Sequence, residues 1–555
     1  MRKALLKILG LMTAFLICLS FALALDQTEA YAAEGGIASD VFVYVPFGEG
    51  RSVNISLTDV GGRTCLFLPS DMSVTGVVFH YDTESEEIRF ADGTVLVPDT
   101  AVDISRYLSK DTGDGSRVLT LTTVKAGAEA SYDIYVMQSA NIPSVFITSS
   151  DPAHGRTYVD ESKSNKATGS MTMLTSSGAV VYDGALSQIK ARGNTTFNAD
   201  KKAYQIKLGA AVDLTQTSSA QANKTWILLA NAYDPTLIHN TAAYRMADSF
   251  GLNAPDCRPV DLYYDGIYRG NYLLCEKVQT GTGRVEIPDL EKMTDDANSG
   301  KDLSKLQTAT GANRYGDIYQ YVTGVKTPDS YDGGYLLELD NAYYKGERSY
   351  FITSTGVAFV VKSPENCSKE EMIYISEYVE EMISASLNGG VNPMTEKSVW
   401  DYIDLKSLAR FFVLQETVCN ADSFASSNYF YLAGAGEPMV AGPVWDFDDS
   451  YGIRDDRTSA EGFVGGTFIE PFMNLPEFRK EVKNFVSSGT YTKAVSGKID
   501  TYVSEIAASQ KMNRILWNDS DQMYTKLESY DADITYMKNY AASRVKWLKG
   551  VFATW

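Results

Sequence analysis

The pattern of strands and helices changes near Pro143, and this change constrains the fold more than any other feature of the chain. Before it, residues 39–142 form short alternating or β-branched runs separated by turn residues, which is typical of short strands. Strands this short and closely spaced predict a β-sandwich of about a hundred residues, which we place at 33–142. The runs lie at residues 41–45, 53–57, 74–81, 118–124 and 131–137.

After Pro143 the chain mixes longer strands with helices, so we expect an α+β domain over residues 143–555. A chain of 555 residues is longer than one core usually holds, which agrees with at least two domains. A polar segment, 292–330, is predicted to be a surface insertion. Helices are expected at 236–250, 369–387 and 405–418 and over most of 476–555, with strands at 260–264, 268–278 and 335–339.

The first residues are typical of an export signal. A basic start is followed by an apolar run and by the small residues Ala30 and Ala32, which predicts a signal peptide over residues 1–32. No later run of about twenty apolar residues is present, so no membrane span is expected after the signal is removed. We therefore expect a secreted or cell-surface protein.

Charge and composition exclude several kinds of partner. A formal charge of −20 argues against a nucleic-acid partner, because a duplex-binding surface needs an excess of basic residues. The cysteines follow no zinc or redox spacing, so we expect buried free thiols, with a bridge between Cys257 and Cys275 as the alternative. The widely spaced histidines His80, His154 and His239 leave little room for a histidine-rich metal site.

Acidic and amide residues gather on both sides of a predicted hairpin. Asp422 and Asn428 precede a strand at 429–432, and Asp446 and Asp448 follow the returning strand. Phosphoryl transfer needs one carboxylate near the attacking hydroxyl and others that hold cations on the phosphates. Carboxylate and amide oxygens also suit magnesium or manganese.

The alternative is a solvated acidic turn, which is the commoner origin of such a cluster. Trp445, Phe447 and Tyr451 lie among the acids, however, and an apolar surrounding makes carboxylates costly unless a cation or hydrogen bonds compensate.

A second cluster spans residues 190–208 and begins K-A-R-G-N. Arg192 and the following turn present a guanidinium and backbone N–H groups suited to phosphate. Lys202 and Lys207 fall on opposite faces of the next strand, so at most one points into a shared cleft. An ordinary basic hairpin is the alternative.

Taken in chain order, these segments resemble the CotH kinase family. The matching stretches are A-R-G-N-T-T-F with K-K-A-Y-Q-I-K-L, W-I-L-L-A-N-A-Y-D-P-T-L-I-H-N-T-A-A-Y-R, Y-Y-D-G-I-Y-R-G-N-Y-L-L-C-E-K-V, G-G-Y-L-L-E-L-D, N-A-D and G-P-V-W-D-F-D. The resemblance implies a two-lobed, protein-kinase-like α+β domain over 143–555, preceded by the small all-β domain.

The same resemblance implies roles for single residues. Asp422 is the expected catalytic aspartate, and ATP with Mg²⁺ or Mn²⁺ is the expected cofactor. No histidine-arginine pair precedes Asp422, and the helix at 236–250 has no glutamate to pair with a lysine, so Glu276 is another candidate partner. The expected metal ligands are Asn428, Asp446 and Asp448, and the expected cofactor contacts are Arg192, Lys202, Lys207, Glu276 and Trp445.

The expected function is a secreted atypical kinase that transfers the γ-phosphoryl group of ATP to serine or threonine of a secreted or surface protein of the spore-coat type, with a serine-rich acceptor. The alternative is a catalytically inactive kinase-like protein that binds a surface. A metal-dependent phosphoesterase is a weaker third hypothesis, because such sites usually use histidine.

Overall fold

The computed structural model describes residues 37, 41–48, 50–82, 87–217, 221–454, 457–517 and 527–555. The predicted signal peptide, residues 1–32, lies outside these ranges. Within the described ranges, no helix combines the length and apolarity needed to cross a bilayer. The described cysteines are all buried free thiols, and Cys257 lies opposite Cys275 on paired strands.

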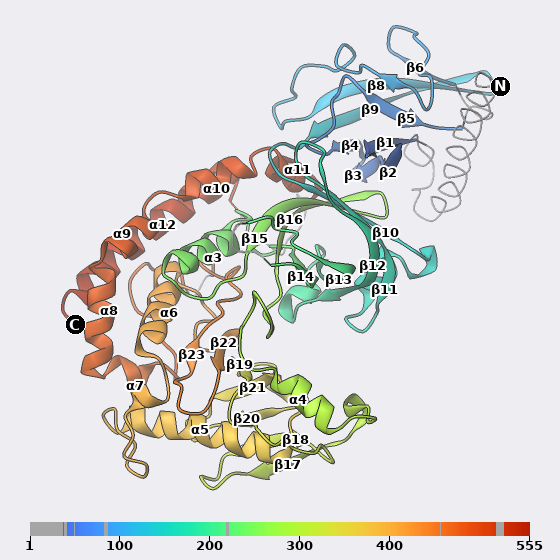
Figure 1. Cartoon of the computed structure of the whole chain (residues 1–555). Helices are drawn as coiled ribbons and strands as arrows, with labels where there is room; N and C mark the ends of the chain where they lie inside the picture. The colour runs from blue at the N-terminus through green and yellow to red at the C-terminus, as the bar shows by residue number, and fades with distance from the viewer. Residues whose placement is uncertain are drawn as a thin grey trace, which may run out of the picture.

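Two sheets form the N-terminal part, drawn in blue in Figure 1. A four-stranded sheet has the order β2-β1-β5-β7, and a five-stranded sheet has the order β3-β4-β9-β8-β6. Their shared core also takes in Phe146, Tyr263, Tyr268 and Met512 from later parts of the chain. The strands are β1 (Phe42–Phe47), β2 (Arg51–Ser56), β3 (Thr58–Val60), β4 (Arg63–Leu68), β5 (Val77–His80), β6 (Glu87–Phe90), β7 (Ala101–Val102), β8 (Arg117–Lys125) and β9 (Ala128–Gln138).

A closed barrel of order β10-β11-β12-β13-β14-β16-β15 comes next in the chain. It closes where β10 pairs with β15 in parallel, while its other neighbours are antiparallel. Asp265 (φ 50°) and Gly266 (φ 77°) form the turn of the β15–β16 hairpin, whose positive φ angles suit a tight hairpin turn. The strands are β10 (Ser144–Ser149), β11 (Ala167–Leu174), β12 (Val180–Arg192), β13 (Ala203–Val212), β14 (Asn223–Leu229), β15 (Cys257–Tyr264) and β16 (Ile267–Glu276).

A seven-stranded sheet of order β17-β18-β20-β21-β19-β22-β23 lies on the other side of the molecule, at the bottom of Figure 1. The segment predicted as a surface insertion is part of it: it forms α4 (Leu290–Ala297) and the two strands at one end of the sheet. The polar composition of this segment predicts a surface loop, so the two strands could not be predicted from it. The strands are β17 (Thr308–Ala312), β18 (Ile318–Val322), β19 (Tyr335–Leu339), β20 (Tyr350–Ile352), β21 (Ala358–Ser363), β22 (Asn428–Leu432) and β23 (Val440–Ala441).

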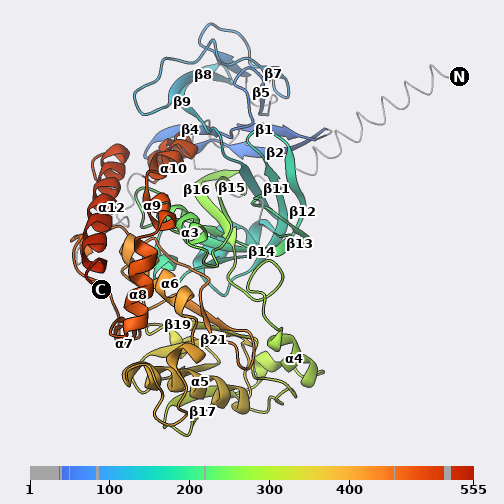
Figure 2. The ribbon, with the colours of Figure 1, turned by 60° about the vertical axis from the view of Figure 1, so that its left-hand side comes forward.

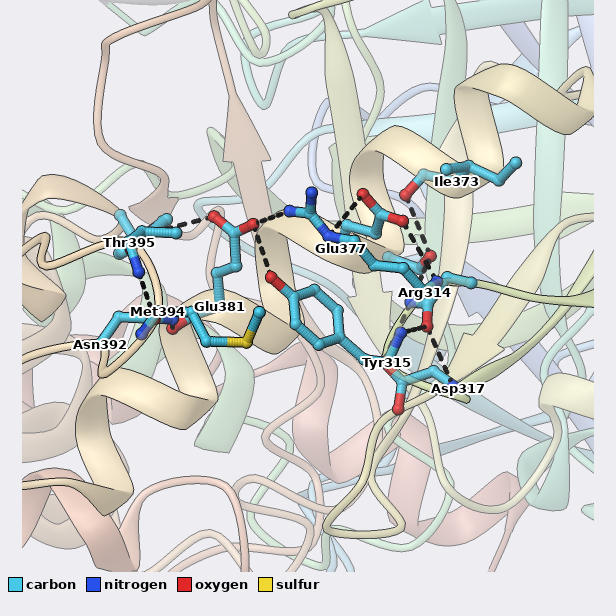
Figure 3. A network of polar contacts seen from close by, with 12 residues as sticks. Arg314, Tyr315, Asp317, Ile373, Glu377, Glu381, Asn392, Met394 and Thr395 are labelled. Atoms are coloured by element: carbon cyan, nitrogen blue, oxygen red, sulfur yellow. Dashed lines mark hydrogen bonds and ion pairs between the residues drawn. The ribbon is translucent and has the colours of Figure 1, made fainter.

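The turn between β17 and β18 is attached to helix α5 (Lys369–Leu387) by polar contacts (Figure 3). The Tyr315 hydroxyl donates to Glu381 at 2.9 Å, and the Arg314 guanidinium pairs with both Glu381 and Glu377. These contacts hold the insertion against the helix and explain why polar residues are ordered there.

Helices form a layer along one side of the barrel and the seven-stranded sheet (Figure 2). Helix α11 (Ser509–Leu516) instead lies between the N-terminal sheets and the barrel (Figure 1), where Met512 enters the N-terminal core. Mixed helices and several sheets make this an α+β chain, as predicted. The other helices are α2 (Arg156–Glu161), α3 (His239–Ser249), α6 (Leu405–Val418), α7 (Glu470–Met473), α8 (Pro476–Val486), α9 (Gly489–Val495), α10 (Ile499–Glu505) and α12 (Tyr530–Phe552).

Candidate functional site

A cleft of about 690 Å³ lies between the barrel and the seven-stranded sheet. Strands β12 to β14 and the first turn of α3 contribute one wall, and the segments after β19, α6 and β23 contribute the other. The predicted site residues that line it are Arg192, Asp422, Trp445, Asp446 and Asp448.

The loop after α6 carries Asp422 to the cleft. The helix ends at Val418, the left-handed backbone of Cys419 (φ 51°) then turns the chain, and β22 begins at Asn428. The Asn428 Nδ2 donates to the Asp422 carbonyl at 3.0 Å, so the two residues hold each other in place. Asn428 is only 1% exposed and does not itself line the cleft, although its chain neighbours Ser427 and Tyr429 do.

The other two acids follow the β22–β23 hairpin, which the structure contains as predicted. Asp446 adopts a left-handed backbone (φ 66°), and the next residues return toward α3. The Asp448 carbonyl lies 3.1 Å from Nδ1 of the buried His239. The hairpin therefore brings Asp422, Asp446 and Asp448 to one cleft.

Burial and, after it, the charges of neighbouring carboxylates raise the pKa values of three acids in the cleft. Burial, followed by the charge of Asp446, raises the pKa of Asp422 to about 6. Burial and the charge of Asp422 raise the pKa of the neighbouring Asp449 to about 6. The pKa of Asp448 rises well above its ordinary value because of burial and then of Asp446. A cation bound among these groups would relieve the repulsion.

The donor set fits a hard divalent cation: Asp446, Asp448 and Asn428 supply carboxylate and amide oxygens only. In the described part of the chain, no three acidic, thiol or imidazole groups already meet at one metal position. Magnesium bound with a nucleotide takes only one or two carboxylates from the protein and the rest of its ligands from phosphates and water. The residues therefore fit a cation that arrives with phosphates.

Basic residues face the acids across the cleft. Lys190 and Arg192 on β12 line the barrel wall of the cleft. Lys362 on β21 lines the other wall, where it pairs with Glu338 and Glu347. Burial lowers the pKa of Lys190, as do the charges of Lys166 and Arg192. The Arg192 guanidinium lies 5.3 Å from the centre of the Trp445 ring, within range of a cation–π contact. An anionic ligand would find positive charge on this wall.

The turn after β12 reaches the opposite wall. Gly193 (φ 111°) is required there, since a Cβ would lie 2.2 Å from the Thr196 Oγ1. The Thr195 hydroxyl then contacts the Tyr343 hydroxyl at 2.8 Å, and Tyr343 follows β19. Both residues line the cleft.

Three predicted cofactor contacts lie elsewhere. The Lys202 Nζ donates to the Phe197 carbonyl at 2.7 Å, and Lys207 is exposed on β13; neither lines the cleft. Glu276 is buried, pairs with Arg284 and accepts from the Asp256 N–H at 3.0 Å. The structure thus groups these residues with the barrel surface and its core.

Several lining residues were not singled out from the sequence. Lys190 opens the K-A-R-G-N motif and Asp340 ends L-E-L-D, so both lay inside recognised motifs without an assigned role. Asp449 directly follows the D-F-D segment, and its carboxylate lies 3.2 Å from Arg454. Arg454 also lies 3.9 Å from Asp422, and no pattern in the sequence indicated it.

This chain is similar to a family model and to solved structures. The family model described as "CotH kinase protein" matches residues 189–548, which is more than half of the chain. No curated protein matches. Among solved structures, the Helicobacter pylori proinflammatory kinase CtkA is matched at 8% identity over 63% of this chain and 94% of that one, with a TM-score of 0.19. A TM-score this low carries no argument about the fold.

Proposed function

The chain belongs to the CotH kinase family, and from that premise we propose that it transfers the γ-phosphoryl group of ATP to serine or threonine hydroxyls of a secreted or surface protein. The observation that supports this most is the shared cleft: Asp422, Asp446 and Asp448 line one wall, and Lys190 and Arg192 line the other. A nucleotide with its cations requires acidic side chains that hold the cations and basic side chains that contact the phosphates.

In this proposal Asp422 orients the acceptor hydroxyl and accepts its proton. Asn428, Asp446 and Asp448 hold Mg²⁺ or Mn²⁺, which supplies charge neutralisation on the phosphates. Lys190 and Arg192 bind the phosphates, and Trp445 packs beside the Arg192 guanidinium. Burial is the larger cause of the raised pKa of Asp422 and does not depend on the charge of Asp446, so it makes Asp422 a better proton acceptor than an ordinary aspartate.

We further propose that the barrel with α3 forms one lobe of a kinase-like domain, and that the seven-stranded sheet with the remaining helices forms the other. The nucleotide would lie in the cleft between them. Among the basic residues, position favours Lys190 for phosphate contact, because it lines the cleft. Lys202 and Lys207 stay predictions for phosphate contact, and Glu276 stays a prediction as the partner of a lysine.

A secreted or surface acceptor follows from the predicted signal peptide at residues 1–32, and the spore-coat type of acceptor follows from the family resemblance. A serine-rich acceptor protein is therefore the first substrate to try.

The test uses the chain without its signal, labelled ATP, Mn²⁺ or Mg²⁺ and a serine-rich acceptor protein. Wild type should transfer label, and Asp422→Ala should not. Asp248→Ala is the matched control, because Asp248 is exposed on α3. If wild type and Asp422→Ala transfer equally little label, the chain is an inactive kinase-like protein and the proposal fails.

A further inference from the structure

The peptide group between Asp446 and Phe447 is held at both of its polar atoms. The Asn420 Nδ2 donates to the Asp446 carbonyl at 3.1 Å. The Phe447 N–H donates to the Asn240 Oδ1 at 2.8 Å. Asn420 is 1% exposed and Asn240, which lines the cleft, is 3% exposed. One peptide is thus fixed by two buried side chains.

This peptide follows a residue in an unusual conformation. Asp446 has a φ of 66°, a left-handed backbone that is uncommon for residues with a Cβ, although aspartate adopts it more readily than most. The backbone at Asp446 sets the direction of its carboxylate. The hydrogen bonds to Asn240 and Asn420 therefore help to hold the backbone from which that carboxylate extends.

Asn420 links the peptide to the rest of the acidic wall. Its Oδ1 accepts from the Asp422 N–H at 3.2 Å, and its Nδ2 also lies 3.0 Å from the Gln415 Oε1. The Gln415 Nε2 donates in turn to the Asn428 Oδ1 at 3.2 Å. A carbonyl oxygen has two lone pairs, so Asn428 keeps one for a cation. These neutral amides connect Asp422, Asn428 and Asp446 without adding charge.

Asn240 reaches the same peptide from the barrel side. It lies in the first turn of α3, and its Nδ2 donates to the Asn231 Oδ1 at 3.1 Å. The preceding residue, His239, contacts the Asp448 carbonyl. Helix α3 therefore touches the acidic segment at two places, while Asn420 belongs to the loop after α6 on the other wall.

We propose that Asn240 and Asn420 are positioning residues for the divalent cation: they fix the Asp446 carboxylate from the two walls, so that tight cation binding requires both walls to be docked. This inference rests on the proposed function. Neither asparagine is assigned a contact with substrate. They act in opposite senses, since Asn240 accepts a hydrogen bond from the peptide and Asn420 donates one to it.

Because Asn240 accepts and Asn420 donates, replacing each by aspartate should affect the peptide differently. Aspartate has the shape of asparagine but donates no hydrogen bond when it is ionised. Mn²⁺ affinity is measured by the EPR signal of free Mn²⁺ in the presence of a non-hydrolysable ATP analogue. Asn240→Ala and Asn420→Ala should each weaken Mn²⁺ binding by about 10- to 100-fold, the usual effect of removing a partner of a metal ligand. Thr241→Ala, at a buried neighbour on α3, is the control.

Asn240→Asp keeps the acceptor for the Phe447 N–H but loses the donor to the Asn231 Oδ1, so it should weaken Mn²⁺ binding less than Asn240→Ala does. Asn420→Asp loses the donor to the Asp446 carbonyl and should be as weak as Asn420→Ala. Raising Mn²⁺ should restore the kcat of the alanine variants. If an alanine variant fails to fold, the Mn²⁺ affinities of the two aspartate variants are compared instead.

Equal Mn²⁺ affinity in all variants, or equal loss in Asn240→Asp and Asn420→Asp, would overturn the inference. If wild type itself binds no Mn²⁺ with the analogue, the proposed function fails along with it. Tight binding by wild type with unchanged variants removes only this inference.

Discussion

The guanidinium of Arg544 on α12 donates to the carboxylate of Glu416 on α6 at 2.5 Å, and both side chains are fully buried. Arg544 also donates to the Glu416 carbonyl at 2.7 Å. The other carboxylate contacts come from the backbone N–H groups of Val464 and Gly465, at 3.1 and 3.0 Å. One ion pair therefore joins two helices and the loop that follows the acidic segment.

Arg544→Met should lower the free energy of unfolding by about 3–5 kcal/mol, because it leaves the Glu416 carboxylate buried without its partner. Denaturant titration measures this, with Lys546→Met, at an exposed position of α12, as the control. Removing both charges in Glu416→Gln/Arg544→Met should cost less than Arg544→Met alone. A loss below about 1 kcal/mol for Arg544→Met would contradict this role of the ion pair.

Lys201 should matter for stability far more than Lys202. The Lys201 Nζ donates to the carbonyls of Ala230 and Asn271 and to the Asn513 Oδ1 on α11, at 2.8, 2.5 and 2.8 Å. Lys201→Met strands these acceptors and should cost about 2 kcal/mol or more of unfolding free energy. Lys202→Met should cost less than about 1 kcal/mol. Equal losses of unfolding free energy for Lys201→Met and Lys202→Met, measured by denaturant titration, would contradict the structural role of Lys201.

Nucleotide affinity should depend on Lys190. Lys190→Met removes a cation from the cleft wall and should weaken binding of an ATP analogue by about tenfold, as expected for a hydrogen bond to a charged group. Lys202→Met and Lys207→Met should change it by less than about threefold, because neither residue lines the cleft. Calorimetric titration with Mn²⁺ present measures all three. A larger loss of affinity for the ATP analogue in Lys207→Met than in Lys190→Met would indicate that Lys207 on β13 contacts the phosphates.

Stability should depend on the pH through Asp317. Burial raises the pKa of Asp317 to about 6, and the nearby Glu380 adds to this. The folded state holds this proton more tightly than the unfolded chain does. The contribution of Asp317 to stability is therefore fully present below about pH 4 and is lost as the pH rises through about 6.

Asp317→Asn removes this loss and should show a smaller fall in Tm between about pH 4 and pH 7 than wild type. Asp332→Asn, at an exposed carboxylate, serves as the control. The same fall in Tm for Asp317→Asn and wild type would contradict the assignment.

Elements with strong local signals could be predicted from the sequence. Helix α5 occupies the predicted residues because Ser368 and Glu371 form a capping box at its start and its apolar residues keep helical spacing. Strand β19 and helix α6 also coincide with their predictions. Pairings between distant segments, such as β10 with β15 in the closed barrel, leave no local pattern and could not be predicted.

The site divides in the same way. Asp422, Asp446 and Asp448 were found because one hairpin brings them together, and a hairpin is a local structure. Lys190 was overlooked because strand alternation within 190–208 does not tell which face meets the opposite wall. Asn420 and Asn240 were overlooked because their roles depend on a contact between α3 and the loop after α6, which only the folded chain creates.

The most direct test of the central claim is the rate of phosphoryl transfer by Asp422→Asn relative to wild type, measured with binding of the Mn²⁺ nucleotide analogue in both. If the cleft performs general-base catalysis at Asp422, the variant should transfer phosphate at least about 100-fold more slowly while its nucleotide affinity stays within about threefold. Equal transfer rates in the two proteins, or no transfer by wild type to any acceptor, would contradict the account.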